Sequence, residues 1–309
     1  GLSLTEFPDL TQVDQLVSPK IAAALAKQQG TFCSPSKKKT PLVTLKDVSF
    51  HFSKEPIIKG IDITLHQGEM VSLVGHNGAG KSTLSNLITG FLPFQKGELL
   101  WKGQSIISES IKERADKIGY VLQNSNQMLS KNIVFEEVAL ALENRGEDPI
   151  NIQEKVLETL KVCGLYEFRN WPISALSYGQ KRRVAVASIL VLEPELLILD
   201  EPTAGQDYYH YTKMMKFLKK LNQQGLTILM ITHDMHLMLE YTERTIVLKE
   251  GQIIADEIPS KVLSSTDLVT SASLRKTSLY HLAKSNQLTD ASGFVSAFIQ
   301  HKGDPYDRE

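Results

Sequence analysis

The sequence contains little cysteine and lacks any apolar run long enough to cross a membrane. Its two cysteines, Cys33 and Cys163, are far apart and form no pair with the spacing of a metal site. This excludes a disulfide-rich scaffold and favours free or buried thiols in a reducing cytosol, with a single disulfide as the disfavoured alternative. The longest apolar stretch, Val184–Leu192, is interrupted by Ser188 and falls well short of the ~18 residues that span a bilayer. Any action on a membrane is therefore expected to pass through a partner.

The sequence also lacks a surplus of either charge. It holds 34 lysines and arginines against 35 aspartates and glutamates, which gives a net charge of −1. A dedicated nucleic-acid binder would carry a basic surplus, so we expect no nucleic-acid partner. Apolar residues are plentiful at 42% of the 309 positions, enough to build a core for one large domain or two modest ones.

Composition and periodicity divide the chain into three parts. Residues 1–40 are expected to form an N-terminal tail and linker, because Ser34–Pro41 combines prolines with lysines that discourage packing. Within this tail, Ile21–Leu25 is expected to be a short helix. Residues 41–264 carry the pattern of a globular domain, and residues 265–309 that of a separate helical extension.

The C-terminal extension has a helical pattern of its own. Its apolar residues recur at helical spacing and form one stripe, made of Phe294, Val295, Phe298 and Ile299. A residue that caps the helix is expected directly before the stripe, at Thr289 or Asp290.

Alternation and apolar runs predict the strands of the central domain. Alternating stretches are expected at Val43–Val48 and Ile61–Leu65, and the short apolar run Met70–Val74 is typical of a buried central strand. Further strands are expected at Leu196–Leu199, Thr227–Ile231 and Thr245–Leu248. Residues 150–195 are expected to be mainly helical. This order of strands and helices predicts an α/β core.

A glycine-rich segment, Gly75-His-Asn-Gly-Ala-Gly-Lys-Ser82, follows the expected buried strand and precedes apolar residues at helical spacing. It fits the phosphate-loop pattern G-x-x-x-x-G-K-S without a gap, and this context disfavours an ordinary glycine-rich turn. The glycines let successive backbone N–H groups surround phosphate oxygens, and the following helix directs its positive end at the same anion. We expect Lys81 to reach the β and γ phosphates of a nucleotide and Ser82 to bind Mg²⁺.

A second acidic site follows the apolar run Leu196–Leu199, where the chain continues as Asp200-Glu-Pro202. A buried strand would deliver Asp200 to the C-terminal edge of the sheet, beside the metal. Glu201 is then expected next to the water that attacks the γ phosphate, as its general base or as the group that orients it. Alone the segment would be an ordinary strand-ending turn, and the phosphate loop gives it the catalytic interpretation.

The pentapeptide Leu176-Ser-Tyr-Gly-Gln180 resembles the signature of ATP-binding cassette (ABC) ATPases, usually Leu-Ser-Gly-Gly-Gln. Tyr178 departs from the commonest form, while the other positions are retained. A serine and a glycine at the start of a helix make a second anion site. Together with the phosphate loop and the second acidic site, the pentapeptide makes residues 42–260 similar to the ABC ATPase family.

The resemblance implies roles for further residues. Gln123 stands where the family has a glutamine that touches Mg²⁺ and the transport partner. His233 stands where it has a switch histidine at the γ phosphate, and Asp207 where it has an aspartate at the dimer contact. Phe52 occupies the place of an aromatic residue that stacks on adenine, with Phe50 as the alternative.

The motifs and the resemblance together predict an ATP and Mg²⁺ site. The expected catalytic residues are Lys81, Gln123, Glu201 and His233. The expected Mg²⁺ ligands are Ser82, Gln123 and Asp200. The expected nucleotide contacts are Phe52, Gly75, His76, Asn77, Gly78, Ala79, Gly80, Lys81, Ser82, Thr83, Ser177, Gly179, Gln180 and Asp207. The implied fold is a P-loop α/β core with an antiparallel β subdomain, a helical subdomain around residues 125–180 and the C-terminal helical extension.

Several segments are similar, more narrowly, to ABC ATPases of the energy-coupling-factor type. These segments are Tyr120–Met128, Cys163–Gln180 and Thr232–Tyr241. They are most similar to the second half of the tandem ATPases assigned to hydroxymethylpyrimidine/thiamine import, although Ser125 stands where that group usually has proline. The extension at 265–309 is similar to the tails of these ATPases. Residues 1–40 are then expected to be the end of a preceding ATPase domain and its linker.

The resemblance implies an ATPase at the cytoplasmic face of the membrane that energises uptake of a vitamin or vitamin precursor, such as thiamine or hydroxymethylpyrimidine. Each ATP would lie between the phosphate loop of one subunit and the signature of another. The implied partners are therefore a second ABC ATPase domain, identical or not, a transmembrane coupling subunit and a substrate-binding membrane subunit. Cobalt or nickel uptake is the alternative within this class.

Two further classes of function are less well supported. A soluble ABC protein that acts on ribosomes or DNA would carry long coiled-coil inserts or strongly basic segments, and the sequence has neither. A catalytically inactive regulatory subunit is disfavoured because Glu201 and His233 are both present.

The segment Gln123–Val138 is unusually apolar for a surface loop. Its apolar side chains are Met128, Leu129, Ile133, Val134 and Phe135. In the family this segment lines the groove that receives a helix of the membrane subunit. Two interpretations stay open, in which these side chains pack under the helical subdomain or remain partly exposed for docking.

Overall fold

The computed structural model describes residues 40–274, 277–285 and 290–301. The segment Ile21–Leu25 and Cys33 lie outside this part of the chain, so the expectations for the N-terminal tail stay predictions. Within it, the elements follow the sequence-based expectations closely. The run Met70–Val74, for example, is a strand with those bounds.

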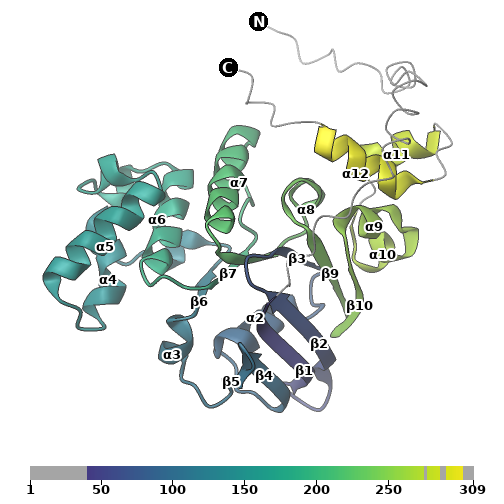
Figure 1. Cartoon of the computed structure of the whole chain (residues 1–309), viewed down its shortest axis with the longest axis horizontal. Coiled ribbons are helices and arrows are strands. Elements are labelled where there is room, and N and C mark those ends of the chain that lie inside the picture. Colours follow the sequence, from purple (N-terminus) through teal and green to yellow (C-terminus); the bar gives the residue numbers. More distant parts are fainter. Residues whose placement is uncertain (1–39, 275–276, 286–289, 302–309) are drawn as a thin grey trace, which may run out of the picture.

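The core of the molecule is a six-stranded sheet in the order β10-β9-β3-β8-β7-β6, drawn across the middle of Figure 1. Its strands are β3 (Met70–Val74), β6 (Ile118–Val121), β7 (Leu196–Asp200), β8 (Thr227–Ile231), β9 (Arg244–Lys249) and β10 (Gln252–Glu257). Neighbouring strands run parallel, except that β10 pairs antiparallel with β9. Every residue of β3 and β8 is buried, as central parallel strands require. The carboxyl ends of the parallel strands meet at one edge, where the loops that follow them gather.

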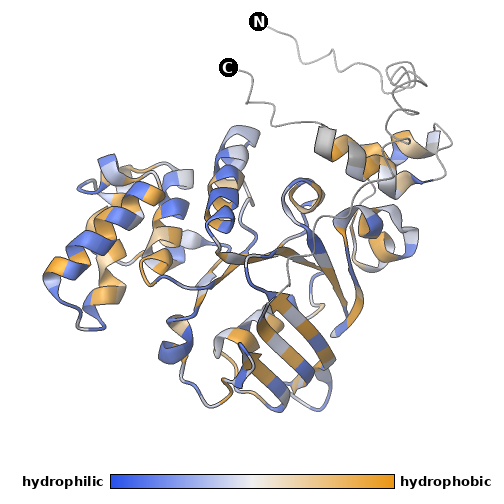
Figure 2. Cartoon of the chain, viewed as in Figure 1, coloured by the Kyte–Doolittle hydropathy of each residue, from blue (hydrophilic) through white to orange (hydrophobic). Residues whose placement is uncertain are grey.

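A second sheet is antiparallel and has the order β2-β1-β4-β5. Its strands are β1 (Pro41–His51), β2 (Pro56–His66), β4 (Lys96–Trp101) and β5 (Gln104–Ser105). Figure 2 shows apolar and polar residues alternating along these strands, and Ile61, Ile63 and Leu65 of β2 are buried while Asp62 is exposed. This buried face shares one core with α2 (Lys81–Thr89) and the six-stranded sheet, while α3 (Ile111–Ala115) lies beside it.

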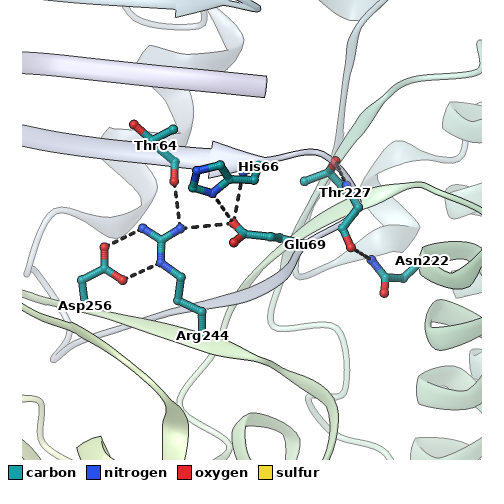
Figure 3. A network of polar contacts seen from close by, with 8 residues as sticks. Thr64, His66, Glu69, Asn222, Thr227, Arg244 and Asp256 are labelled. Atoms are coloured by element: carbon teal, nitrogen blue, oxygen red, sulfur yellow. Dashed lines mark hydrogen bonds and ion pairs between the residues drawn. The ribbon is translucent and has the colours of Figure 1, made fainter. Parts of the chain in front are cut away.

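A polar network joins the two sheets where β2 ends and β9 begins (Figure 3). The Arg244 guanidinium on β9 makes a bidentate pair with Asp256, with both N···O distances 2.5 Å. Its Nη1 also donates to the Thr64 carbonyl oxygen at 2.8 Å and to the buried Glu69 carboxylate at 3.1 Å. The hydrogen bonds to Asp256 raise the pKa of Arg244. A single charged side chain of the parallel sheet therefore anchors β2 of the antiparallel sheet.

The helical subdomain forms the lobe on the left of Figure 1. Its elements are η3 (Ser125–Met128), α4 (Val134–Glu143), α5 (Pro149–Val162), η4 (Tyr166–Phe168), η5 (Ile173–Ala175) and α6 (Tyr178–Leu190). Asp148 caps α5 ahead of Pro149, a proline at the first helical position. The lobe has its own apolar core, which includes Val138, Val156 and Val184.

The apolar segment Gln123–Val138 contributes mainly to packing. Val134 is fully buried, and the other four apolar side chains named above are half-buried. Met128 packs against a second apolar core, which β7 and β8 share with residues 208–223. Its sulfur accepts a hydrogen bond from the Leu122 N–H at 3.3 Å. Leu129 packs against the core of the helical subdomain. These contacts favour the packing interpretation for most of the segment.

The remaining helices follow the parallel strands or form the C-terminal extension. They are α7 (Tyr208–Gln223), α8 (Met235–Tyr241), α9 (Pro259–Ser264), α10 (Thr266–Ser271), α11 (Ser278–Ser285) and α12 (Ala291–His301). Phe294 and Val295 of the predicted stripe are buried, and Leu239 of α8 packs against them. The Asp290 carboxylate accepts from the Gly293 N–H at 2.8 Å, which makes Asp290 the cap, while Thr289 lies outside the described residues. No helix in the described ranges has both the length and the apolar character needed to cross a bilayer.

Candidate nucleotide site

Two glycines of the phosphate loop, Gly75 and Gly80, lie where a Cβ would meet close neighbours. Gly75 ends β3, and a Cβ there would lie 2.1 Å from the Leu248 carbonyl oxygen. Gly80 begins α2 with a left-handed backbone, and a Cβ there would lie 2.8 Å from the Ile58 side chain. The loop can therefore press against β2 and β9 while its backbone N–H groups stay available to an anion at the helix N-terminus.

The Lys81 side chain folds back against the backbone of the phosphate loop. Its ammonium donates to the carbonyl oxygens of Gly75 at 2.7 Å and His76 at 3.1 Å. Burial lowers the pKa of Lys81, and the nearby charges of Glu201 and Asp200 act in the opposite direction. The only lysine of the loop is thus held at its centre, facing the two carboxylates across the cavity.

The four predicted catalytic residues and most of the predicted phosphate-loop contacts meet around one cavity of about 470 Å³ at the carboxyl edge of the parallel strands. The predicted contacts Gly75, His76 and Ala79 are not among the residues that line it. Its walls are formed by Ile57, Asn77, Gly78, Gly80, Lys81, Ser82, Thr83, Gln123, Asp200, Glu201, Ile231 and His233. Segments that are far apart in sequence therefore converge here, namely the phosphate loop, the segment after β6 and the ends of β7 and β8. The apolar members Ile57 and Ile231 were not predicted, because nothing in their local sequence separates them from ordinary strand residues.

Glu201 and His233 form a close pair on this cavity. The Glu201 Oε1 lies 2.6 Å from the His233 Nδ1, and its Oε2 accepts from the Thr232 hydroxyl at 3.3 Å. The glutamate side chain is 13% exposed, whereas that of the histidine is 75% exposed. Glu201 has a left-handed backbone with φ of 47°. This conformation is rare for a residue with a side chain and marks a position that its surroundings fix.

Asp200 is the second carboxylate on this cavity, and like Glu201 it is half-buried. Burial, and secondly the charge of Glu201, raise the pKa of Asp200, while Lys81 and a hydrogen bond from the Tyr120 hydroxyl act against this. A cation placed beside Asp200 would relieve the repulsion between the carboxylates. Tyr120 was not singled out from the sequence, since an aromatic residue in a short strand is ordinary.

The residues predicted to bind a metal ion line this cavity and offer oxygen ligands. They are the exposed Ser82 hydroxyl, the Asp200 carboxylate and the Gln123 amide. The described residues contain no group of three or more histidines, cysteines, aspartates and glutamates that could hold a metal. This donor set fits Mg²⁺, which takes one or two protein oxygens and completes its shell with water and phosphate oxygens.

The signature residues lie at a different cavity, of about 310 Å³. It is lined by Ser177, Gly179, Gln180, Arg183, Gln206, His210, Lys213 and Met214. Ser177 and Gln180 form a capping box at the start of α6, in which the Ser177 hydroxyl accepts from the Gln180 N–H and the Gln180 side chain accepts from the Ser177 N–H. Within one chain, the signature and the phosphate loop therefore do not share a cavity.

Other predicted contacts lie outside the nucleotide cavity. Phe52 is 64% exposed and packs edge-to-face on Phe50, with the ring centroids 4.8 Å apart. Phe50 is buried, so it is not available to stack on a base. Asp207 caps α7 and bonds to the backbone N–H and the imidazole of His210. Of these residues, only His210 lines either of the two cavities described above.

Comparison with known proteins shows which family this fold belongs to. The family model for ABC transporters matches residues 58–204. A protein of Enterococcus faecalis named as an ABC transporter ATP-binding protein is 53% identical over 310 residues, which cover 97% of this chain and 54% of the relative. One of Streptococcus pneumoniae with the same name is 49% identical over 92% of this chain and 50% of the relative. The chain thus spans about half the length of the curated relatives it matches.

Solved structures extend the comparison. Clostridium perfringens cbiO1, described as part of the ABC transporter complex cbiONQ, is 31% identical, with a TM-score of 0.70, over 81% of this chain and all of that one. An ATP-binding cassette solved as a dimer in a post-hydrolysis state with ADP and Pi is 32% identical, with a TM-score of 0.61, over 71% of this chain and 99% of that one. These matches confirm the predicted α/β P-loop fold with its antiparallel sheet and helices. The chain belongs to the ABC transporter family of ATP-binding cassette ATPases.

Proposed function

We propose that the chain binds and hydrolyses MgATP as one cassette of a two-cassette unit that energises an importer of the energy-coupling-factor type. The observation that carries the proposal is the convergence of the phosphate loop with Asp200, Glu201 and His233 around one cavity. The cavity volume of about 470 Å³ is in the range of small-molecule sites. Its mix of an ammonium, backbone donors and carboxylates suits a metal-bound polyphosphate.

The phosphate loop and Lys81 would hold the β and γ phosphates. Lys81 now donates to two loop carbonyls, and it would exchange one of these bonds for a phosphate oxygen without leaving the loop. The N-terminus of α2 adds its dipole at the same place. Mg²⁺, held by Ser82, Asp200 and Gln123, would neutralise the charge on the transferred phosphate.

Glu201 would orient and polarise the water that attacks the γ phosphate. Its carboxylate lies on the cavity wall and already has two partners, the His233 imidazole and the Thr232 hydroxyl. These contacts fix the direction of the carboxylate before substrate enters, which is how positioned groups lower a barrier. The His233 ring is 75% exposed, so it would meet the γ phosphate while its Nδ1 stays on Glu201.

The signature would serve the ATP of a second cassette. Its cavity is separate from the phosphate loop of the same chain and carries Lys213, Arg183 and the capped N-terminus of α6, features that suit an anion. A dimeric ATP-binding cassette among the similar structures supports a paired arrangement. The half-length match to the curated relatives supports a second cassette in the same polypeptide, to which residues 1–40 would lead.

The proposed membrane partners are a transmembrane coupling subunit and a substrate-binding subunit, met at the cytoplasmic face. A groove of about 380 Å³ beside η3, with Leu129, Pro172 and Ile173 among polar residues, is the surface on which the coupling subunit would dock. The similarity to cbiO1, itself part of a larger transporter complex, supports partners of this kind. Thiamine or hydroxymethylpyrimidine is the proposed cargo from the sequence resemblance, with cobalt or nickel as the alternative.

Phosphate release from MgATP by the purified chain tests the ATPase proposal. We expect hydrolysis in the wild type and its loss in Glu201→Gln, and equal rates in the two proteins would overturn the role of Glu201. Reconstitution of the full-length protein with its membrane subunits in liposomes tests the cargo. Uptake of labelled thiamine or hydroxymethylpyrimidine supports the proposal, whereas uptake of Co²⁺ or Ni²⁺ alone would replace it with the alternative.

A further inference from the structure

A buried arginine connects the helix of the signature residues with the turn that carries Glu201. Arg182 lies in the second turn of α6 and is 1% exposed. Its Nη2 donates to the carbonyl oxygen of Glu201 at 2.5 Å and to that of Gln123 at 3.3 Å, with the Asp200 carbonyl oxygen at 3.5 Å. All three acceptors belong to residues that line the nucleotide cavity.

Burying an arginine at this position costs solvation free energy. Burial lowers the pKa of Arg182, and the charges of Tyr178, Glu201 and Asp200 oppose that shift. Its hydrogen-bond partners in the described part of the chain are all backbone carbonyls. A well-packed apolar residue would fill the same space at lower cost in solvation. The guanidinium is therefore better explained by the backbone that it holds than by packing.

The Glu201 backbone that Arg182 holds has an uncommon conformation. Glu201 has φ of 47°, and its N–H donates to the Ile231 carbonyl oxygen at 2.8 Å. Its carbonyl oxygen accepts from the Ala204 N–H at 3.2 Å and from Arg182. A left-handed residue with a side chain persists only where such contacts fix it. The same backbone turns the Glu201 carboxylate toward His233, 2.6 Å away.

We propose that Arg182 is a positioning residue, which holds the left-handed backbone of Glu201 from α6 and thereby orients the Glu201 carboxylate against His233. The inference rests on the proposed function, in which that carboxylate orients the attacking water. Because the signature residue Ser177 caps α6, a shift of this helix at a partner's nucleotide would reach Glu201 of the same chain through one side chain. Arg182 would thus couple the two nucleotide sites of a pair.

Arg182→Met tests the proposal, because methionine fills most of the space and removes the donors. Measured on the full chain, we expect kcat to fall at least about ten-fold, while the affinity for a fluorescent ATP analogue stays within about two-fold. Arg182→Lys keeps a cationic donor on a shorter stem and should recover part of kcat. If Arg182→Met unfolds below the assay temperature, the kcat of Arg182→Lys tests the proposal instead.

Arg114 provides a matched control for the loss of a buried arginine. It is 3% exposed, and its guanidinium also donates only to backbone carbonyls, those of Leu87, Ile88, Ile106 and Ile107. These acceptors lie away from the nucleotide cavity. Arg114→Met should lower the melting temperature but leave kcat per folded molecule unchanged. A purely structural Arg182 would behave in the same way.

The combination with Glu201→Gln shows whether Arg182 acts through Glu201. We expect the double variant to hydrolyse ATP no more slowly than Glu201→Gln alone. The effects of two substitutions that act through one group are not additive. Full additivity, or a wild-type kcat in Arg182→Met alone, would overturn the inference while the proposed function stands. A wild-type chain that hydrolyses no ATP would overturn the proposed function, and this inference with it.

Discussion

Gly251, in the turn between β9 and β10, lies directly against the backbone of Ile57. A Cβ on Gly251 would stand 2.0 Å from the Ile57 carbonyl oxygen. The Gly251 N–H donates to the Ala79 carbonyl oxygen at 3.0 Å, and the Gly251 carbonyl oxygen accepts from the Lys59 N–H at 2.9 Å. One turn residue thus fixes the phosphate loop and β2 relative to the parallel sheet.

We therefore predict that Gly251→Ala disturbs both stability and nucleotide binding. The substitution adds a clash with backbone to the strain of a left-handed alanine, so we expect a loss of at least about 2 kcal/mol in the free energy of unfolding. Gly103→Ala is the control, because Gly103 has a similar φ of 85° but open space where the Cβ would lie. It should cost only about 1 kcal/mol. Denaturant unfolding and ATP titration measure both effects, and equal losses in the two variants would contradict this account.

Glu201→Gln should separate binding from hydrolysis. The amide keeps the size of the side chain but is a poor acceptor for a proton and loses its charge toward His233. We expect ATP binding to persist while steady-state hydrolysis falls at least about 100-fold, and a closed, ATP-bound pair of cassettes to accumulate. Lys81→Ala, which removes a phosphate contact, should instead weaken binding itself. Gel filtration with ATP and phosphate-release kinetics distinguish these outcomes.

The sequence predicted the fold through its continuous motifs. The run Met70–Val74 followed by the phosphate loop predicts a strand, a tight loop and a helix, and a Cβ on Gly75 would meet the Leu248 carbonyl oxygen at 2.1 Å. Convergence of Gln123, Asp200 and His233 followed from strand ends meeting at one edge of a parallel sheet.

Contacts that depend on long-range packing could not be predicted in this way. Arg182 stands in a basic run after the signature, and its sequence does not indicate that it is buried against the Glu201 carbonyl. Met128 and Leu129 were candidates for docking, and both pack in part against apolar cores of the chain itself, while Leu129 also lines the groove beside η3. Phe52 has the expected place in sequence yet lies outside the cavity wall. In each case the neighbours come from distant segments, which local pattern does not report.

Cys163 should be unreactive in the folded protein. It is 1% exposed, and burial raises its pKa to about 12. In a Cys33→Ala variant we expect no labelling by a thiol reagent at pH 8 until the chain is unfolded, because the thiolate is the reactive form. The folded state keeps the proton to higher pH than the unfolded state, so this group's contribution to stability is complete below about pH 9 and declines from pH 9 to 12. Rapid labelling of the native variant would contradict the burial.

Ser177→Arg should block hydrolysis without removing nucleotide from its own subunit. The signature cavity is separate from the phosphate loop of the same chain, so the added side chain would obstruct the partner's ATP. The substitution also removes a helix cap, and Ser110→Arg controls for this, because Ser110 forms the same capping box with Glu113 on α3. We expect Ser110→Arg to retain ATPase activity.

Mixed pairs of variants give the sharpest test of a composite site. A Ser177→Arg chain paired with a Lys81→Ala chain holds one site with both defects and one site with neither. If each ATP lies between the phosphate loop of one cassette and the signature of the other, mixing two inactive variants should restore part of the activity, up to about half per pair if the sites act independently. Restored phosphate release on mixing supports the shared site. Full activity in Ser177→Arg alone would contradict it, and a mixed pair without activity would contradict independent action of the two sites.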